Sequence, residues 1–519
     1  MKLQKQKVKN FIAFLIFCFL IWEVFLHCTY LFRDTYRAGR QNIVGFYDEK
    51  EDSLDAVFVG ASCVYRYWDC MHAWKSYGIA SYDYSVGSMS PAATIFAIKD
   101  IQKTQNPQVI VFDVRKILSR FPDTAGGIWG TIDSQDYNIN RLAAVEYYCR
   151  INGVALKDAW SEIVDIITYH NNHAALASEL SWQLRDNRID ESLDKEGFYK
   201  GFAIAPDHAF VESPQYALTE ETMALDEQLE TVYIDILEYS KTNEVPILLV
   251  ASPFVVTKED TAQFNRMEEI AQEYDIPFLN TNKYYEEMNL DFSTDFYDVN
   301  HVNIYGAEKY TDFLAKYITE NYEFSGLSNN LSNAAWESIY EQYDLEMKEA
   351  RKTLQQTIDD KYRAFEIEAK MRETNQAYSW LSMADNSNIT VLVLMCRPCD
   401  NMPSLESQSY LGKYGVLFGK EDEYHSYMAR FSDEVLYGSY VDTEHAGLLG
   451  EEDNIDYFLS IEGQPQLMIG EKNYFGDSLS GIHMAAFDNN TNEVVDVINI
   501  NILENGSLTL EHYETGGSF

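Results

Sequence analysis

Short apolar runs alternate with amphipathic helical patterns through the first two thirds of the chain, and this alternation sets the expected fold class. Apolar runs of four or five residues without polar alternation are typical of strands that are buried on both faces. They occupy residues 56–59, 109–112, 246–250 and 276–279. Helical patterns lie near residues 218–240 and 260–274 and again after Asn303. Strands that alternate with helices predict an α/β fold with a parallel sheet covered on both sides.

The pattern changes in the last third of the chain. Residues 325–332 are rich in Ser, Asn and Gly, which indicates a boundary. From about residue 385, strand-like runs replace the helical patterns, at residues 389–394, 457–461, 482–487, 494–500 and 508–513. We therefore expect an α/β domain over residues 33–325, a helical linker over 326–380 and a β-rich domain over 381–519.

The expected linker carries a short heptad-like seam of apolar residues. The seam consists of Trp336, Tyr340, Tyr343, Met347, Ala350 and Leu354. Two interpretations are open at this point. The helix packs on its own α/β domain, or it forms a short coiled coil that joins two copies of the chain.

The N-terminus differs from the rest of the chain. Four lysines among the first nine residues precede an apolar run at residues 11–32 whose single formal charge is Glu23. This run is long enough to span a bilayer, and its bulky end does not resemble a signal-peptide cleavage site. We expect residues 1–9 to be a cytoplasmic tail and residues 10–32 a single transmembrane helix, with the rest extracytoplasmic.

Glu23 and His27 lie one helical turn apart within this expected anchor. Ionisable groups at membrane depth are costly unless they are paired or reach water. A neutral Glu, snorkelling or water access would each explain Glu23. The alternative is that this face contacts a multispanning membrane partner.

Charge and cysteine content exclude several functions. The formal net charge is −42, which argues against nucleic-acid binding because no basic stripe is present to displace counterions. Cys396 and Cys399 form a lone close pair with no second pair at zinc-site spacing, and whether they are bonded is open. The sequence therefore predicts no metal and no cofactor.

A serine and an Asp-x-x-His motif are the strongest candidates for chemistry. Ser62 follows the first predicted strand, at the edge of a parallel sheet where sites form. A serine hydroxyl needs a base, and the base needs an acceptor that holds its tautomer. His301 and Asp298 fit these two roles, although each of the three residues would also fit a structural turn or helix cap. The backbone N–H groups of Ser62 and Gly87 are candidate oxyanion donors.

These residues resemble the SGNH/GDSL hydrolases. The likeness rests on Gly60-Ala61-Ser62 after a strand, the Gly87 loop, and Asp298-Val299-Asn300-His301 followed by Asn303-Ile304-Tyr305-Gly306. It covers roughly residues 53–322 and is nearest to the membrane-anchored extracytoplasmic branch, which includes DltD-type proteins and AlgX- and PatB-like acetyltransferases. The resemblance implies a three-layer α/β/α, flavodoxin-like domain, with Ser62, Asp298 and His301 as the triad.

One departure from the family concerns the oxyanion hole. The family's Gly-x-Asn-Asp loop is replaced after the second predicted strand by Phe112-Asp113-Val114-Arg115. A carboxylate is a poor oxyanion donor, so we expect Arg115 or a backbone group to substitute.

The resemblance implies a membrane-anchored extracytoplasmic serine esterase or O-acyltransferase. Its substrate would be an acetyl or D-alanyl type ester on a cell-surface polysaccharide or teichoic acid, with a multispanning acyltransferase contacting Glu23 and His27 as a partner. The alternative is a non-catalytic glycan-binding or scaffold protein on a degenerate SGNH fold.

Overall fold

The computed structural model divides the chain into two compact units, Met1–Thr357 (unit 1) and Ile358–Phe519 (unit 2). It describes residues 2–32, 40–120, 128, 131–132, 134–135, 140–155, 157, 199–324, 333–385, 388–395, 401–416, 426–432, 435–441, 445–448, 455–459, 466–469, 472–473, 481–489 and 494–513. The expected boundary at residues 325–332 and the pair Cys396 and Cys399 lie outside these ranges.

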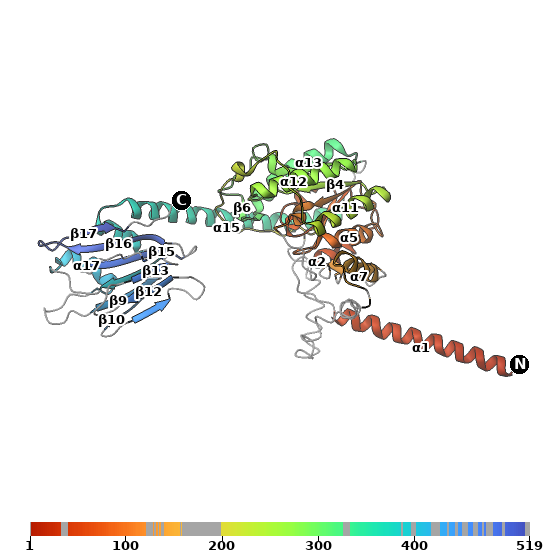
Figure 1. The fold of residues 1–519 in the computed structure, drawn as a ribbon, viewed down its shortest axis with the longest axis horizontal. Helices are drawn as coiled ribbons and strands as arrows, with labels where there is room; N and C mark the ends of the chain where they lie inside the picture. Colours follow the sequence, from red (N-terminus) through yellow and green to blue (C-terminus); the bar gives the residue numbers. More distant parts are fainter. Residues whose placement is uncertain are drawn as a thin grey trace. The chain divides into compact units, whose positions relative to one another are not determined.

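Unit 1 is built on a five-stranded parallel sheet with the order β2-β1-β3-β4-β5. Figure 1 labels strand β4 of this sheet. The strands are β1 (Ala56–Gly60), β2 (Ser81–Ser85), β3 (Val109–Asp113), β4 (Ile247–Ala251) and β5 (Phe278–Asn280). All five residues of β1, β3 and β4 are buried, as their unbroken apolar runs predict. The α/β class and the parallel sheet are confirmed.

Strand β2 was not predicted, because its sequence Ser-Tyr-Asp-Tyr-Ser has no apolar run. It is nevertheless fully buried, at the edge of the sheet. Two of its polar side chains are satisfied locally: Ser81 Oγ accepts from Trp68 Nε1 at 2.8 Å, and the Tyr84 hydroxyl donates to Asp100 Oδ2 at 2.7 Å. Hydrogen bonds of this kind allow polar side chains to be buried, and an apolar sequence pattern does not reveal them.

Two groups of helices pack beside the sheet. In one, α4 (Cys70–Tyr77) meets α13 (Ile304–Asn321), where the Asp69 N–H donates to Thr311 Oγ1 at 2.9 Å. In the other, α11 (Glu227–Thr242) meets α12 (Lys258–Glu273), where the Tyr233 hydroxyl donates to the Met267 carbonyl at 3.0 Å. The remaining helices of unit 1 are α2 (Arg40–Phe46), α3 (Ser62–Tyr65), α5 (Thr94–Ile101), α7 (Asn140–Ile151) and the 3-10 turns Pro91–Ala93, Val114–Ile117, Pro214–Ala217 and Thr281–Lys283.

Helix α15 (Ala334–Glu373) carries the heptad-like seam, and the seam packs within unit 1. The rings of Trp336 and Trp74 lie 5.7 Å apart, and the Tyr343 hydroxyl donates to Asp69 Oδ2. Met347 and Leu354 are also buried. These contacts support the first of the two interpretations, in which the helix packs on its own domain.

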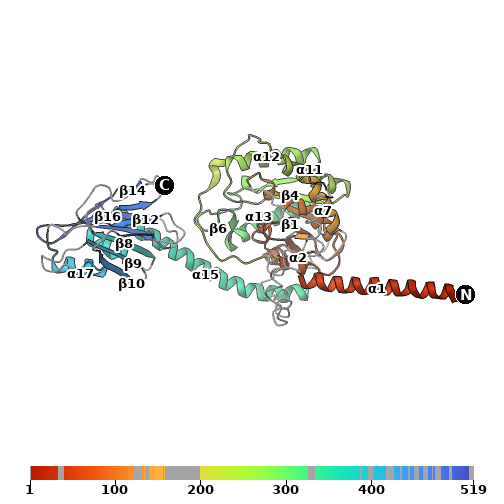
Figure 2. The same cartoon turned by 60° about the horizontal axis from the view of Figure 1, so that its bottom comes forward.

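Unit 2 contains antiparallel sheets, in agreement with the β-rich prediction. The order of the larger sheet is β10-β9-β8-β15-β16-β17, and Figure 2 shows β8, β9 and β10 side by side. Its strands are β8 (Ile389–Met395), β9 (Ser426–Ser432), β10 (Val435–Val441), β15 (Ile482–Asp488), β16 (Val494–Ile502) and β17 (Leu508–His512). A second sheet contains β11 (His445–Leu448), β12 (Ile455–Leu459), β13 (Gln466–Ile469) and β14 (Lys472–Asn473).

Two helices of unit 2 were not predicted as such, α16 (Ala377–Ala384) and α17 (Leu405–Lys413). Trp380 from α16 and Leu411 from α17 are fully buried in one core with strand residues such as Val391 and Met484. The helices therefore complete the core over one face of the larger sheet. The unit begins inside α15, so the expected helical linker is shared between the two units rather than standing apart from them.

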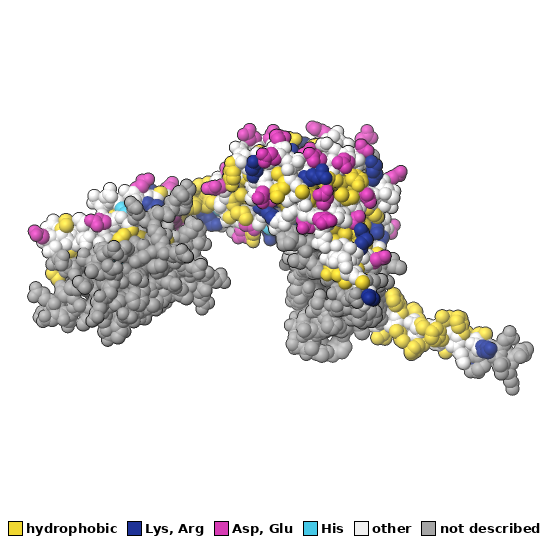
Figure 3. All heavy atoms as spheres, viewed as in Figure 1, with side chains coloured by type: hydrophobic (Ala, Val, Ile, Leu, Met, Phe, Trp, Pro, Cys, Tyr) yellow, Lys and Arg dark blue, Asp and Glu magenta, His cyan; other side chains and the backbone are white. Residues whose placement is uncertain are grey.

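The N-terminal helix α1 runs from Lys2 to Phe32, so most of the expected cytoplasmic tail belongs to the same helix as the expected anchor. Apolar side chains cover its described surface (Figure 3), and Phe11 and Val24 are 62% and 63% exposed. Among the described residues, no helix combines the length and apolarity needed to cross a bilayer. A transmembrane helix at residues 10–32 is therefore not shown. The side chain of His27 lies outside the described residues.

Candidate active site

Ser62 occupies the first position of α3, directly beyond the end of β1. The turn between the two is tight. A Cβ at Gly60 would lie 2.8 Å from Val64 Cγ2 and 3.3 Å from Asp113 Cβ, so only glycine fits without a shift. The Gly-Ala-Ser sequence thus places the Ser62 hydroxyl at the carboxyl edge of the sheet.

The Asp-x-x-His motif forms a small hairpin. In it, β6 (Phe296–Asp298) pairs with β7 (His301–Val302), and Asp298 stands opposite His301. The Asn300 N–H donates to Asp298 Oδ1 at 2.6 Å, which closes the turn. A three-residue spacing therefore brings the carboxylate beside the imidazole of the same loop.

The residues that follow the motif fix this hairpin on α13. Asn303 caps the helix, with its Oδ1 accepting from the Tyr305 N–H at 3.0 Å, and its Nδ2 donates to the Thr294 carbonyl at 2.8 Å. A Cβ at Gly306 would lie 2.5 Å from the Asp295 carbonyl oxygen. The asparagine and the glycine are thus required for the loop to sit tightly on the helix.

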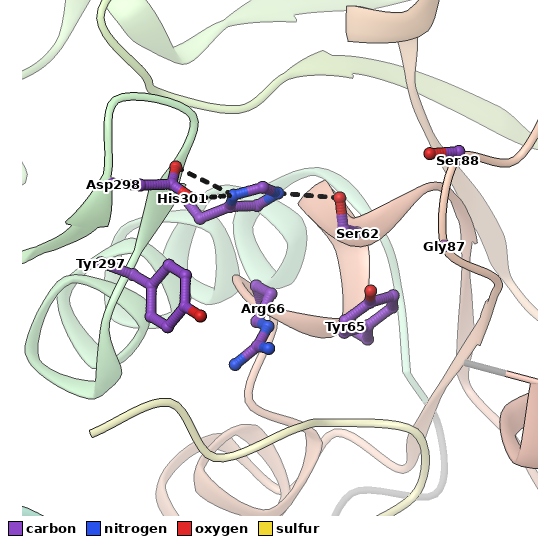
Figure 4. A pocket seen from close by; sticks show the side chains of 8 residues that line it. All are labelled: Ser62, Tyr65, Arg66, Gly87, Ser88, Tyr297, Asp298 and His301. Atoms are coloured by element: carbon purple, nitrogen blue, oxygen red, sulfur yellow. Dashed lines mark hydrogen bonds and ion pairs between the residues drawn. The ribbon is translucent and has the colours of Figure 1, made fainter. Parts of the chain in front are cut away.

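The hairpin brings His301 to Ser62, and Figure 4 shows the three side chains in line. Ser62 Oγ lies 2.8 Å from His301 Nε2, and His301 Nδ1 lies 3.0 Å from both carboxylate oxygens of Asp298. An ionised carboxylate only accepts, so Nδ1 carries the proton and Nε2 accepts from the Ser62 hydroxyl. This is the arrangement of a nucleophile, a base and an orienting acid.

Local electrostatics keep the acid ionised. Partial burial raises the pKa of Asp298, but hydrogen bonds from His301 and the backbone N–H groups of Asn300 and His301 outweigh it. The net pKa is lowered from its ordinary value. Asp298 is therefore a carboxylate at neutral pH, as the orienting role requires.

The three side chains line a pocket of about 370 Å³ that also contains Gly87 and Ser88. Ser88 has a φ of 55°, in the left-handed region that a non-glycine residue rarely adopts. The predicted position of Gly87 beside Ser62 agrees with the lining of the pocket.

Arg115 does not line this pocket, and its predicted role as an oxyanion or substrate contact is not supported. Its guanidinium is buried behind the hairpin, where Nη2 donates to the Asn300 carbonyl at 2.7 Å and Nη1 to the Tyr67 hydroxyl at 3.0 Å. Arg115 follows β3, but its side chain runs beneath the loop instead of into the cavity. It positions the loop that carries His301.

Three further lining residues were missed: Tyr65, Arg66 and Tyr297. Tyr65 and Arg66 stand three and four residues after Ser62, the spacing that places side chains on one face of a helix. A helix beginning at Ser62 would have indicated both. Tyr297 directly precedes Asp298, but strand alternation gives no sign that it borders the pocket.

Cys63 neighbours the serine without sharing its site. Its thiol is buried and donates to Asp113 Oδ1 at 3.1 Å. Burial and the Asp113 charge raise the pKa of the Cys63 thiol well above its ordinary value. Cys63 is therefore a poor nucleophile, because the thiolate is the reactive form.

No set of three or more His, Cys, Asp or Glu side chains is grouped as metal ligands in the part of the chain that the structure describes. Comparison with protein-family models and with curated protein sequences found no match for the chain.

Proposed function

We propose that the protein is a serine esterase or O-acyltransferase of the SGNH type, with Ser62 as nucleophile, His301 as general base and Asp298 as the orienting acid. The observation that carries the proposal is the continuous chain of hydrogen bonds from the Ser62 hydroxyl through both His301 nitrogens to Asp298. The strand order of the sheet and the two groups of helices are compatible with the three-layer SGNH domain.

The first half of the reaction forms an acyl-enzyme. Ser62 Oγ attacks the ester carbonyl while His301 Nε2 takes the hydroxyl proton, and Asp298 stabilises the imidazolium that results. Collapse of the tetrahedral intermediate breaks the bond to the alcohol oxygen, and His301 returns the proton to that oxygen. The alcohol leaves, and the acyl group remains on Ser62.

The second half releases the acyl group to water or to an acceptor hydroxyl. His301 takes the proton of the incoming oxygen, and the same steps run in reverse to restore Ser62. The developing negative charge needs N–H donors. The N–H of Ser62 has no intrahelical acceptor, because Ser62 is the first residue of α3, and the Gly87 backbone borders the same pocket.

The cellular setting is part of the proposal. The exposed apolar side chains of α1 favour a membrane-anchored, extracytoplasmic enzyme, with a cell-surface polysaccharide or teichoic acid as the acyl acceptor or ester substrate. Glu23, whose side chain lies among them, is the proposed contact for a multispanning acyltransferase, together with His27.

Labelling with a fluorophosphonate tests the chemistry. Such probes react covalently with activated serines, so we expect the native chain to be labelled and Ser62→Ala to remain unlabelled. Ser88→Ala is a matched control because Ser88 also lines the pocket but forms no hydrogen bond with a described histidine. Labelling that persists in Ser62→Ala, or no labelling of the native chain, would contradict the proposal and favour the non-catalytic alternative.

A further inference from the structure

Arg66 places a guanidinium in the pocket of the proposed nucleophile. Arg66 directly follows α3, and its N–H donates to the Ser62 carbonyl at 3.1 Å, so its position is tied to that of the serine. Its side chain lines the same cavity as Ser62 and His301. Figure 4 shows the guanidinium in the space between Tyr65 and Tyr297.

Aromatic rings hold this guanidinium in place. Arg66 Cζ lies 5.0 Å from the ring centroid of Tyr297 and 5.8 Å from that of Tyr65. The Tyr297 ring in turn packs edge-on to the imidazole of His301, with centroids 6.3 Å apart. Ring contacts orient the charge without neutralising it.

Within the described residues, Arg66 forms no ion pair with a carboxylate. Four other arginines that the structure describes in unit 1 do form one: the pairs are Arg120–Asp260, Arg150–Asp235, Arg266–Glu230 and Arg351–Glu308. Asp298 is the one carboxylate among the lining residues of this cavity, and both of its oxygens face His301. In a chain with a net charge of −42, a partly buried cation that pairs with no described carboxylate points to a partner outside the protein.

We propose that Arg66 is a specificity-determining residue that binds an anionic group, a carboxylate or a phosphate, on the substrate of Ser62. A guanidinium offers a planar set of donors that matches both groups. The net charge of the protein repels anions at a distance, so selectivity for an anionic ester has to come from a local cation. This inference rests on the proposed esterase chemistry and defines the substrate class more narrowly.

A series of aryl acetates tests the subsite. The probes are 4-nitrophenyl acetate, which is neutral, 4-acetoxybenzoate, which carries a carboxylate, and 4-acetoxyphenyl phosphate. The ratio of kcat/KM between variant and native chain is taken for each probe, which cancels their different intrinsic reactivities. We expect Arg66→Gln to lower kcat/KM for at least one anionic probe by about 10- to 100-fold, and for the neutral probe by less than about 3-fold.

Two further variants sharpen the result. Arg66→Lys keeps the charge and should recover part of the anionic preference, mainly through KM. Arg150→Gln removes a cation that is paired with Asp235 outside this pocket, and it should leave all three ratios near one. The anionic probe that loses more activity in Arg66→Gln identifies the group, carboxylate or phosphate.

The failures are distinguishable. An equal loss on neutral and anionic probes would show that Arg66 only supports Tyr297 and the hairpin, and the subsite would be rejected. Ser62-dependent hydrolysis with no effect of Arg66→Gln would reject the subsite and keep the proposed esterase. If no probe is hydrolysed and no fluorophosphonate is bound, both the anionic subsite and the proposed esterase are rejected.

Discussion

The two units each contain an imidazole held by a carboxylate, but only one of these two pairs meets a serine hydroxyl, that of Ser62. In unit 1, His301 Nδ1 lies 3.0 Å from Asp298, and in unit 2, His512 Nδ1 lies 2.9 Å from Asp496. The two histidine side chains are similarly exposed, at 22% and 25%. The difference is the second ring nitrogen: His301 Nε2 meets the Ser62 hydroxyl, whereas His512 Nε2 donates to the Thr374 carbonyl at 2.8 Å.

The pKa values of the two carboxylates also differ. Burial raises the pKa of Asp496, although His512 and the indole N–H of Trp380 oppose the shift. The pKa of Asp298 is lowered instead, because it is less buried and the hairpin supplies backbone donors. A His–Asp pair is therefore not evidence of catalysis by itself. The partner of Nε2 decides whether the histidine is available as a base or only links parts of the fold.

The largest expected effect comes from removing the nucleophile. Ser62→Ala should lower kcat for 4-nitrophenyl acetate by about 10⁴-fold or more, since the remaining groups of a triad act only together. His512→Ala, which removes the histidine of the pair in unit 2, should leave kcat within about 2-fold of the native value. Steady-state hydrolysis of both variants provides the comparison. A comparable loss in both would mean that the two pairs are not distinct.

Replacement of the proposed orienting acid, Asp298, should have the next largest effect on kcat. In Asp298→Asn the amide no longer fixes the tautomer of His301, and kcat should fall by about 10³- to 10⁴-fold. The measurement is kcat for the neutral ester with the fold monitored by circular dichroism. Activity retained within 10-fold would show that Asp298 only closes the turn with Asn300.

A third histidine, His483 in β15, lies in the core of unit 2 and should respond to pH. It is fully buried, its Nδ1 lies 2.8 Å from the Tyr513 hydroxyl, and burial lowers its pKa to about 4. The unfolded chain takes up the proton near pH 6.5. Stability is therefore retained above pH 6.5 and lost between pH 6.5 and 4, by up to about 3 kcal/mol.

Hydrogen exchange in β15 measures this loss as a function of pH. The exchange protection of β15 should decline across that window, and His483→Gln should flatten the decline. An unchanged slope in the variant would show that another group titrates.

The smallest expected effect is the loss of stability in His512→Ala. His512→Ala removes the link between Asp496 and the end of α15 and leaves a buried carboxyl with fewer donors, at a cost of about 1–3 kcal/mol in unfolding free energy. Denaturant unfolding followed by fluorescence measures it. Leu503→Ala, at an exposed position of the same unit, is the control and should change stability by less than about 0.5 kcal/mol. Equal values for the two variants would remove the structural role given to His512.

The sequence predicted the parts of the molecule that depend on pattern and order. Apolar runs located β1, β3, β4 and most of β5, and the order of Ser62 and the Asp-x-x-His motif indicated the site before any geometry. Strand β2 was missed because its burial depends on side-chain hydrogen bonds from Trp68 and to Asp100, which pattern does not reveal.

The sequence also did not predict the direction in which side chains point. Arg115 was placed correctly after β3, but only the packing of Tyr67 and Asn300 shows that it runs beneath the loop. Arg66 was overlooked because the short helix α3 was not predicted, so its register with Ser62 was not visible. Motif order thus indicated the candidate site, whereas the lining residues and the side-chain directions required the structure.

The central claim, that Ser62 forms a covalent acyl intermediate with His301 as base, is tested most directly by intact-protein and peptide mass spectrometry. The native chain is incubated with 4-nitrophenyl acetate, quenched in acid and digested. The account predicts one acetyl group on the peptide that contains Ser62, absent in Ser62→Ala and strongly reduced in His301→Ala. Acetylation found only elsewhere, or at Ser62 to the same extent in His301→Ala, would contradict it.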